Sequence, residues 1–204
     1  MNLRFIDIET TGLNTYAGHE ITQFAMLETT ENLAVTRAVV YNFYHDGMHW
    51  GDEAEAITGI HKSDLIPYKD QYEENLCHLY VCCARANLVG HNIEKFDFPF
   101  IVNYLRNRIN LNTIAASITD TLKIWRPHVP RGRANLQALC EDAGLTPSLI
   151  ESLTKLYFKQ ETHAHNAAYD VMATYMIYNL ARQRGYLQDY RIQQEQPKFV
   201  PVEV

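Results

Sequence analysis

The sequence lacks most features of membrane, secreted and zinc-binding proteins. It has four cysteines in 204 residues, and none shows a C-x-x-C spacing (Cys77, Cys82, Cys83 and Cys140). We therefore expect reduced thiols, mostly in helices. No run of about 18 apolar residues is present, which excludes a typical transmembrane helix. The first residues contain no basic region followed by an apolar stretch, so we expect no secretion signal and a cytoplasmic location.

The chain also has fewer basic than acidic residues. The chain has 18 Lys and Arg residues against 24 Asp and Glu residues, for a formal net charge of −6. Proteins that hold long duplex DNA mainly through phosphate contacts are usually basic. We therefore expect any contact with nucleic acid to be short and local. A cluster of acids that binds metal would lower the net charge without repelling substrate once the metal is bound.

Internal repeats and low-complexity linkers are absent as well. The length supports one domain with a single core. The segment after Tyr190 is polar and contains Pro197 and Pro201. We expect one domain over residues 1–190 and a C-terminal tail over residues 191–204 that lacks a packed core contact.

The apolar patterns of the first part predict three strands. Residues 3–8 are nearly continuously apolar, as in a strand that is covered on both faces. Residues 20–28 and 33–44 have β-branched and aromatic residues at strand-like spacing, with a turn at Glu31-Asn32 between them. These patterns predict a three-stranded antiparallel meander.

The second part alternates helices with short strands, which predicts an α/β fold with helices on the faces of one sheet. Pro99 fits the first turn of a helix, and Gly144 and Gly185 fit helix C-termini. The expected helices cover residues 52–59, 61–65, 70–85, 99–108, 135–143 and 166–184, and the expected strands cover residues 88–90 and 116–121.

Asp7 and Glu9 are the first candidate functional residues. Residues two apart in a strand point to the same side, so two carboxylates lie side by side at the end of a buried strand. Unpaired, they would repel each other and lose hydration, at a cost of several kcal/mol. A divalent cation between them removes that cost. The alternative is that both are solvated residues at a strand end.

Two further segments add polar residues to this pattern. Thr10, Thr11, Gly12 and Leu13 follow the acids and predict a turn with exposed backbone N–H groups, which could hold a terminal nucleotide. The other segment contains His91, Asn92, Phe96 and Asp97, with Asp97 at a helix start. Taken alone, an aspartate at this position is usually a helix N-cap.

A third segment places Asp170 in the first turns of the last long helix. His165 precedes it by five residues, about 140° away on an ideal helix, so His165 should lie before the helix with Asn166 near the cap. A histidine on such a loop can approach a metal site. His163 and His165 could alternatively be surface residues or a weak H-x-H metal site.

Together these three segments resemble the motifs of the DnaQ-like 3′→5′ exonuclease family, of the DEDDh type, and polymerase proofreading domains in particular. Phe5-Ile6-Asp7-Ile8-Glu9-Thr10-Thr11-Gly12-Leu13 is similar to the first motif. Gly90-His91-Asn92 with Phe96-Asp97 is similar to the second, with four residues between Asn92 and Asp97 where many members have three. His165-x4-Asp170 is similar to the third. Weaker similarities lie at Thr58-Gly59-Ile60-His61, at Asp120-Thr121-Leu122 and between Leu136 and Leu145.

The resemblance implies an RNase H-like fold with a mixed five-stranded sheet and helices on both faces. It also implies two divalent cations, Mg²⁺ or Mn²⁺. Asp7 would bridge both ions, Glu9 and Asp170 would hold the ion that carries the attacking water, and Asp97 would help to hold the second. His165 would take the proton from the nucleophile, a role that suits an unperturbed pKa near 6.5.

The same resemblance assigns substrate contacts to Thr10, Thr11, Gly12, Leu13, His91, Asn92 and Phe96. Phe96 and Leu13 would flank the terminal base, since aromatic stacking tolerates every base. Arg131 and Arg133 are candidates for contacts with phosphates behind the terminus, or they belong to a solvated loop.

The expected activity is removal of nucleotides from a nucleic-acid 3′ end as 5′-monophosphates. Single-stranded or frayed DNA is favoured over RNA, with a DNA polymerase or replication protein as a partner and no membrane contact. The alternative substrate is RNA, for trimming or oligonucleotide decay. Two other hypotheses fit less well: an inactive end-binding module, because all four acids are present, and a zinc hydrolase, because a third ligand at zinc spacing is missing.

Overall fold

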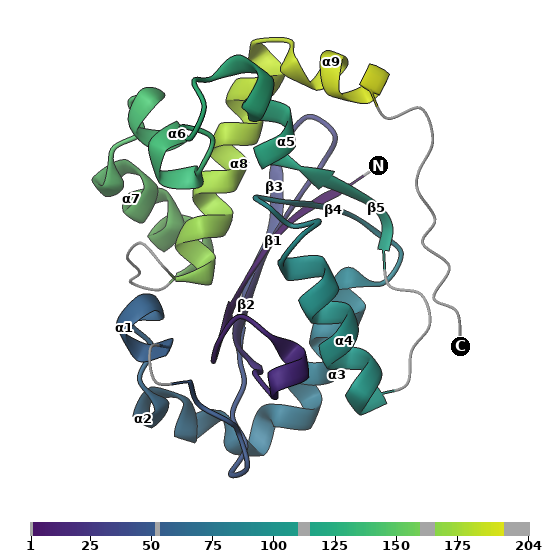
Figure 1. The fold of residues 1–204 in the computed structure, drawn as a ribbon, viewed down its shortest axis with the longest axis vertical. Coiled ribbons are helices and arrows are strands. Elements are labelled where there is room, and N and C mark those ends of the chain that lie inside the picture. The colour runs from purple at the N-terminus through teal and green to yellow at the C-terminus, as the bar shows by residue number, and fades with distance from the viewer. Residues whose placement is uncertain (1, 52–53, 110–114, 160–165, 194–204) are drawn as a thin grey trace.

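The computed structural model describes residues 2–51, 54–109, 115–159 and 166–193 (Figure 1). Its centre is a five-stranded mixed sheet in the order β3-β2-β1-β4-β5. The antiparallel meander predicted for the first part is confirmed, and β4 and β5 add to β1 in parallel. The strands are β1 (Leu3–Thr10), β2 (Ile21–Thr29), β3 (Val35–Asn42), β4 (Ala86–Gly90) and β5 (Ala115–Asp120).

Helices cover both faces of the sheet, as predicted (Figure 1). One face carries α3 (Tyr72–Cys83) and α4 (Asp97–Ile109), and the other carries α5 (Thr121–Trp125), α6 (Leu136–Asp142), α7 (Pro147–Phe158), α8 (Ala167–Gln183) and α9 (Tyr186–Gln193). The shorter elements are η1 (Thr15–Ala17), α1 (Ala54–Thr58), α2 (Lys62–Leu65), η2 (Ile66–Gln71) and η3 (Arg126–His128).

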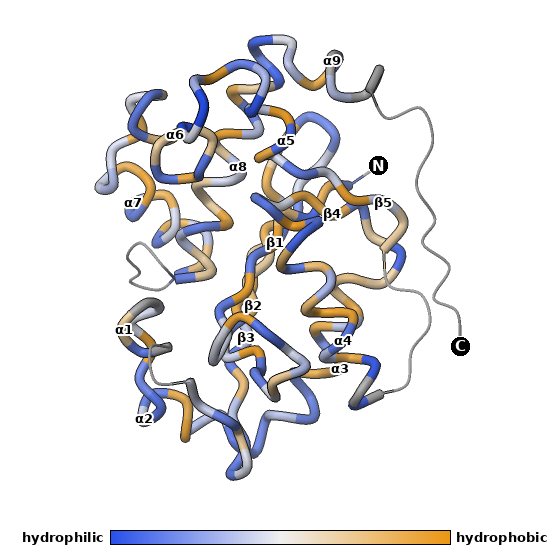
Figure 2. The backbone as a smooth tube through the Cα atoms, in the orientation of Figure 1, coloured by the Kyte–Doolittle hydropathy of each residue, from blue (hydrophilic) through white to orange (hydrophobic). Residues whose placement is uncertain are grey.

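Alternation along β1 produces two cores, one on each side of the sheet. Ile6 and Ile8 pack against α3 and α4, whereas Phe5 packs against α8. Hydrophobic stretches run along the central strands β1 and β2 (Figure 2). Because successive side chains of a strand point to opposite faces, Asp7 and Glu9 share the α8 side with Phe5.

Two helices differ from the sequence expectation. The helix α7 was not predicted, although Thr146 accepts a hydrogen bond from the Leu149 N–H as its N-cap and Pro147 stands at its first position. The expected tail begins inside α9, which continues to Gln193, and Tyr190 is buried against the α8 core. An aromatic residue that fills a core site holds this segment in place. Residues 194–204 lie outside the described chain.

The cysteines occupy helices as predicted: Cys77, Cys82 and Cys83 lie in α3, Cys140 lies in α6, and all four are free thiols. Among the described residues, no helix combines the length and the apolar character needed to span a membrane.

Candidate functional site

Three carboxylates converge where β1 ends and α8 begins. Oxygen atoms of Asp7, Glu9 and Asp170 all lie within 4.8 Å of one another. Asp7 and Glu9 project from the same side of β1, and Asp170 extends from the first turn of α8. This geometry is consistent with the prediction from the sequence that the three carboxylates lie close together.

The start of α8 is held in place by two side chains. Asn166 caps the helix by accepting a hydrogen bond from the Ala168 N–H at 3.1 Å, as expected. The carboxamide oxygen of Gln23 accepts a hydrogen bond from the Ala167 N–H, also at 3.1 Å. Gln23 lies directly opposite Glu9 in the sheet. This positioning role was missed, although a glutamine inside the apolar run of β2 was a signal for it.

Asp97 begins α4 and is only 3% exposed. β4 pairs with β1 only from Leu3 to Phe5, so the backbone of Ile8 extends beyond it. The Asp97 carboxylate accepts a hydrogen bond from the Ile8 N–H at 3.2 Å. Asp97 therefore ties α4 to the strand that carries Asp7 and Glu9, although it stands outside the group of three.

Burial and mutual repulsion disturb the ionisation of these acids. Burial, followed by repulsion from the neighbouring carboxylates, raises the pKa of Asp7 well above its usual value and the pKa of Glu9 to about 8. Burial also raises the pKa of Asp97 to about 7, against the hydrogen bonds from its own N–H and from the Ile8 N–H.

This donor set fits a divalent cation. Among the described residues, no lysine, arginine or histidine contributes to the pKa shift of Asp7 or Glu9. Within the described ranges, no basic side chain therefore offsets the negative charge of Asp7 and Glu9. The group that the described residues form consists of carboxylates alone, and close carboxylate oxygens suit hard ions such as Mg²⁺ and Mn²⁺.

The loop after β1 is tightly built. The side chain of Thr11 is fully buried, its N–H donates to the Glu20 carbonyl at 2.8 Å, and its hydroxyl accepts from the Glu20 N–H at 2.9 Å. The expectation of a freely exposed N–H is therefore wrong for Thr11, because the carbonyl of Glu20, just before β2, accepts from that donor. The Thr10 hydroxyl donates to the Gly12 carbonyl at 2.8 Å.

Gly12 and Leu13 complete this loop. A Cβ atom on Gly12 would lie 2.4 Å from the ring of His19, so no larger residue fits there. Leu13 is 79% exposed. An exposed leucine on a rigid loop remains a good candidate for contact with a base.

His91 and Asn92 form the turn that leads from β4 to α4. The His91 ring contacts the Thr121 hydroxyl at 2.9 Å, and burial lowers the pKa of this histidine to about 4. Asn92 adopts a left-handed conformation with φ 62°. Its carbonyl accepts hydrogen bonds from the N–H groups of Lys95 and Phe96. Both residues therefore shape the turn, and His91 is neutral at physiological pH.

Asp120 holds this turn from the adjacent strand. Its carboxylate accepts hydrogen bonds from the N–H groups of Asn92 at 2.9 Å and Leu122 at 3.0 Å. Phe96, at the end of the turn, is half-buried beside Phe100, with ring centroids 5.7 Å apart. Asp120 is a positioning residue that the sequence indicated only by the weak similarity at Asp120-Thr121-Leu122.

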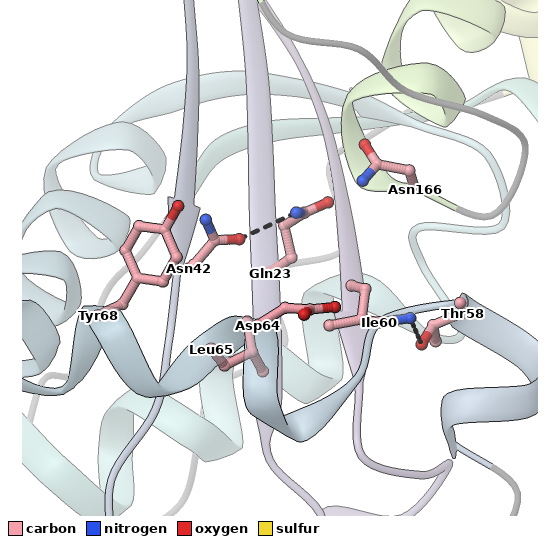
Figure 3. Close-up of a pocket in the computed structure, with 9 residues that line it drawn as sticks. Gln23, Asn42, Thr58, Ile60, Asp64, Leu65, Tyr68 and Asn166 are labelled. Carbon is pink, nitrogen blue, oxygen red and sulfur yellow. Dashed lines mark hydrogen bonds between the residues drawn. The ribbon is translucent and has the colours of Figure 1, made fainter.

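A polar hollow of about 210 Å³ lies beside the acids on the β2–β3 side. Gln23 and Asn42 form its floor, joined by a hydrogen bond of 2.9 Å, and Asn166 approaches from the start of α8 (Figure 3). Asp64 of α2 and Tyr68 of η2 also line the hollow (Figure 3). The hollow therefore contains amide groups and one carboxylate.

The remaining candidates divide into two groups. Arg133 forms ion pairs with Asp142 at 2.5 Å and Glu141 at 3.5 Å. The phosphate contact expected of Arg133 stays a prediction, and in this structure acids of α6 pair with its guanidinium. His163 and His165 lie outside the described residues.

Comparison with known proteins gives consistent matches. The exonuclease family model RNase_T matches residues 5–178. The DNA polymerase III subunit epsilon of Haemophilus influenzae is 29% identical over 150 residues, covering 70% of this chain and 57% of that protein. The subunit of the same name from Pasteurella multocida is 28% identical over 153 residues, covering 70% and 58%. This chain therefore spans less than two thirds of these relatives.

Solved structures agree on the fold. A structure of exonuclease I aligns with a TM-score of 0.72 at 22% identity, over 96% of this chain and 44% of the other. Escherichia coli exonuclease I in complex with a dT13 oligonucleotide aligns with a TM-score of 0.68 at 20% identity, again over 96% and 44%. Exonuclease I from Methylocaldum szegediense aligns with a TM-score of 0.68 at 21% identity, over 90% of this chain and 40% of the other.

Proposed function

The chain belongs to the RNase_T exonuclease family, and from this membership we propose that it removes nucleotides from nucleic-acid 3′ ends as nucleoside 5′-monophosphates. The observation that carries the proposal is the group of three carboxylates with oxygen atoms within 4.8 Å of one another. These acids stand at the residues of the first and third motifs, and Asp97 of the second motif is tied to the same strand.

Exonucleases of this family use divalent metals, and we assign two ions, Mg²⁺ or Mn²⁺, to this site. Asp7, Glu9 and Asp170 would hold one of them, and Asp7 and Asp97 the second. When bound, such ions lower the pKa of water and stabilise charge on the attacking and leaving oxygens. The carboxylates themselves fix where the scissile phosphate can lie, next to the carboxyl end of β1.

The other residues of the motifs would orient the substrate and deprotonate the attacking water. His165 would accept the proton of the attacking water, a step for which a neutral imidazole is suited. The water oxygen then bonds to phosphorus while the bond from phosphorus to the upstream O3′ breaks. Leu13 and Phe96 would contact the terminal base, and Thr10, Thr11, Gly12, His91 and Asn92 would shape the walls around it.

We favour DNA as the substrate and a replication protein as a partner. The relatives are DNA polymerase III subunits, and one structural neighbour is a complex with a dT13 oligonucleotide. RNA is the second candidate, because only small changes near the terminal sugar separate the two substrates. Digestion of matched single-stranded DNA and RNA oligonucleotides at equal rates would refute the proposal that DNA is the preferred substrate.

The decisive test of the activity uses 5′-labelled single strands with free and blocked 3′ ends. Stepwise shortening of the free strand is expected in Mg²⁺ or Mn²⁺, with release of 5′-monophosphates and no activity in EDTA. Internal cleavage of the blocked strand would instead identify an endonuclease. Full activity in EDTA would refute the two-metal assignment.

The role of His165 is tested against its neighbour His163. We expect His165→Ala to lower kcat by about 10²–10⁴-fold, the usual contribution of a general base, while metal affinity measured by calorimetry stays unchanged. His163→Ala should leave kcat nearly unchanged. The reverse result would show that the third motif is wrongly aligned, and loss of metal in both variants would reopen the zinc hypothesis.

A further inference from the structure

A second groove lies on the other side of the candidate site, where β4 and β5 end. Its volume is about 610 Å³. The walls combine the His91–Asn92 turn with the segment that joins α5 to α6. That segment supplies Arg126, Pro130 and Arg131, and the start of α6 supplies Asn135.

The groove presents two arginines that no described acid pairs with. Arg126 and Arg131 are both exposed, and neither forms an ion pair with any described residue. Arg133, two residues further on, is instead held by Asp142 and Glu141. In a chain with a net charge of −6, two free guanidinium groups on one groove attract an anion, and guanidinium suits phosphate.

The groove adjoins the elements that carry the acids. One wall is the turn that leads into Asp97 at the start of α4. The other wall begins α6, which packs against α8, the helix that carries Asp170. The groove is therefore lined by elements that are joined to, or packed against, the helices that carry Asp97 and Asp170.

The two hollows beside the acids differ in charge. The hollow on the β2–β3 side includes the carboxylate of Asp64, and no lysine or arginine is among the described residues that line it. A phosphodiester backbone would be repelled there and attracted by the arginine groove. Leu122 and Pro130 add apolar surface on which sugars or bases can pack.

We infer that this groove binds the single strand upstream of the terminal nucleotide, with Arg126 and Arg131 contacting its phosphates. The inference rests on the proposed exonuclease function and extends it to the path of the substrate. The arginines position the strand and take no part in bond cleavage.

The first experiment measures binding to the full-length protein in EDTA, so that no strand is consumed. A fluorescent 12-nucleotide single strand is titrated with wild type, Arg126→Gln, Arg131→Gln and the double variant. Each single variant should weaken binding about fivefold at low salt and reduce the slope of log K against log salt by about 0.7, the value for one phosphate contact on a single strand. Arg133→Gln is the matched control and should bind as wild type does.

The second experiment compares hydrolysis of a long strand and a dinucleotide in Mg²⁺. The groove variants should raise KM for the long strand and leave kcat unchanged, whereas the dinucleotide should be cleaved at the wild-type rate because it does not reach the groove. If the double variant shows unchanged binding and KM while the wild type hydrolyses the strand normally, the groove is not the binding site of the upstream strand, and the proposed function stands. If binding depends on the two arginines but the wild-type protein hydrolyses neither substrate, the groove still binds a single strand and the proposed function is refuted.

Discussion

Two substitutions of Asp97 separate its structural contact from its charge. Asp97 is 3% exposed, and its carboxylate accepts a hydrogen bond from the Ile8 N–H at 3.2 Å. Asp97→Ala leaves that donor without its partner, which costs about 2 kcal/mol for a buried group. For a chain of this size this cost corresponds to a Tm roughly 4–8 °C below that of a variant that lacks the charge but keeps the acceptor.

Asp97→Asn keeps an oxygen that can accept from the Ile8 N–H and removes only the charge. The metal-free Asn variant should therefore unfold at or above the wild-type Tm, because it also loses repulsion between Asp97 and the other acids. Both variants should lose activity by roughly 10²-fold or more, as expected when support for a metal site is removed.

Thermal unfolding in EDTA and single-turnover hydrolysis in Mg²⁺ give the two readouts. Equal Tm values for the Ala and Asn variants would refute the structural role of the bond to Ile8. Wild-type activity in the Asn variant would show that the charge of Asp97 is not needed at the metal site.

Three further perturbations probe the residues around the acids. Gln23→Ala removes the acceptor for the Ala167 N–H, so it should lower Tm by several degrees and reduce kcat; wild-type kinetics would refute its role in positioning α8. Burial lowers the pKa of His91 to about 4 in the folded protein, whereas a histidine in the unfolded chain has a pKa of about 6.5. Between pH 6.5 and pH 4 the unfolded state therefore binds a proton that the folded state does not, and stability falls as the pH is lowered. His91→Gln should therefore reduce the stability lost between pH 7 and pH 5 by about 2 kcal/mol, as measured by urea unfolding at the two pH values, and an unchanged loss would contradict the neutral buried state. Tyr190→Phe removes the hydroxyl that accepts from the Asp120 N–H and donates to Glu94, which should cost about 1 kcal/mol in the same assay; no loss of stability would show that these bonds contribute nothing.

Local patterns in the sequence were sufficient to predict the strands, the antiparallel meander and the elements that carry the acids, whereas the five-stranded mixed sheet followed from the family resemblance. The strand period puts Asp7 and Glu9 on one side of β1, and the run of apolar residues marks β1 as a strand covered on both faces. Helix-start signals located Asp97 and Asp170. These features depend on residues close together in the chain, so a single sequence reveals them.

The supporting contacts could not be predicted in this way. Gln23 reaches Ala167 across 144 positions of the chain, and Asp120 reaches Asn92 across 28. Nothing in the local spacing indicates such partners, because the fold alone brings them together. The helix α7 is different: Thr146-Pro147 was a local start signal that was overlooked.

The position of Asp97 depends on contacts from most of the fold. α4 is joined to β1 through Ile8, and the turn before it is held by Asp120 at the end of β5. Asp120 is contacted in turn by Tyr190 of α9, beyond the residues that the family model matches. A carboxylate that must stay within reach of three others, despite their repulsion, needs such rigid support from elsewhere. Substitutions in α9 should therefore affect activity through the geometry of Asp97, although α9 itself carries none of the acids.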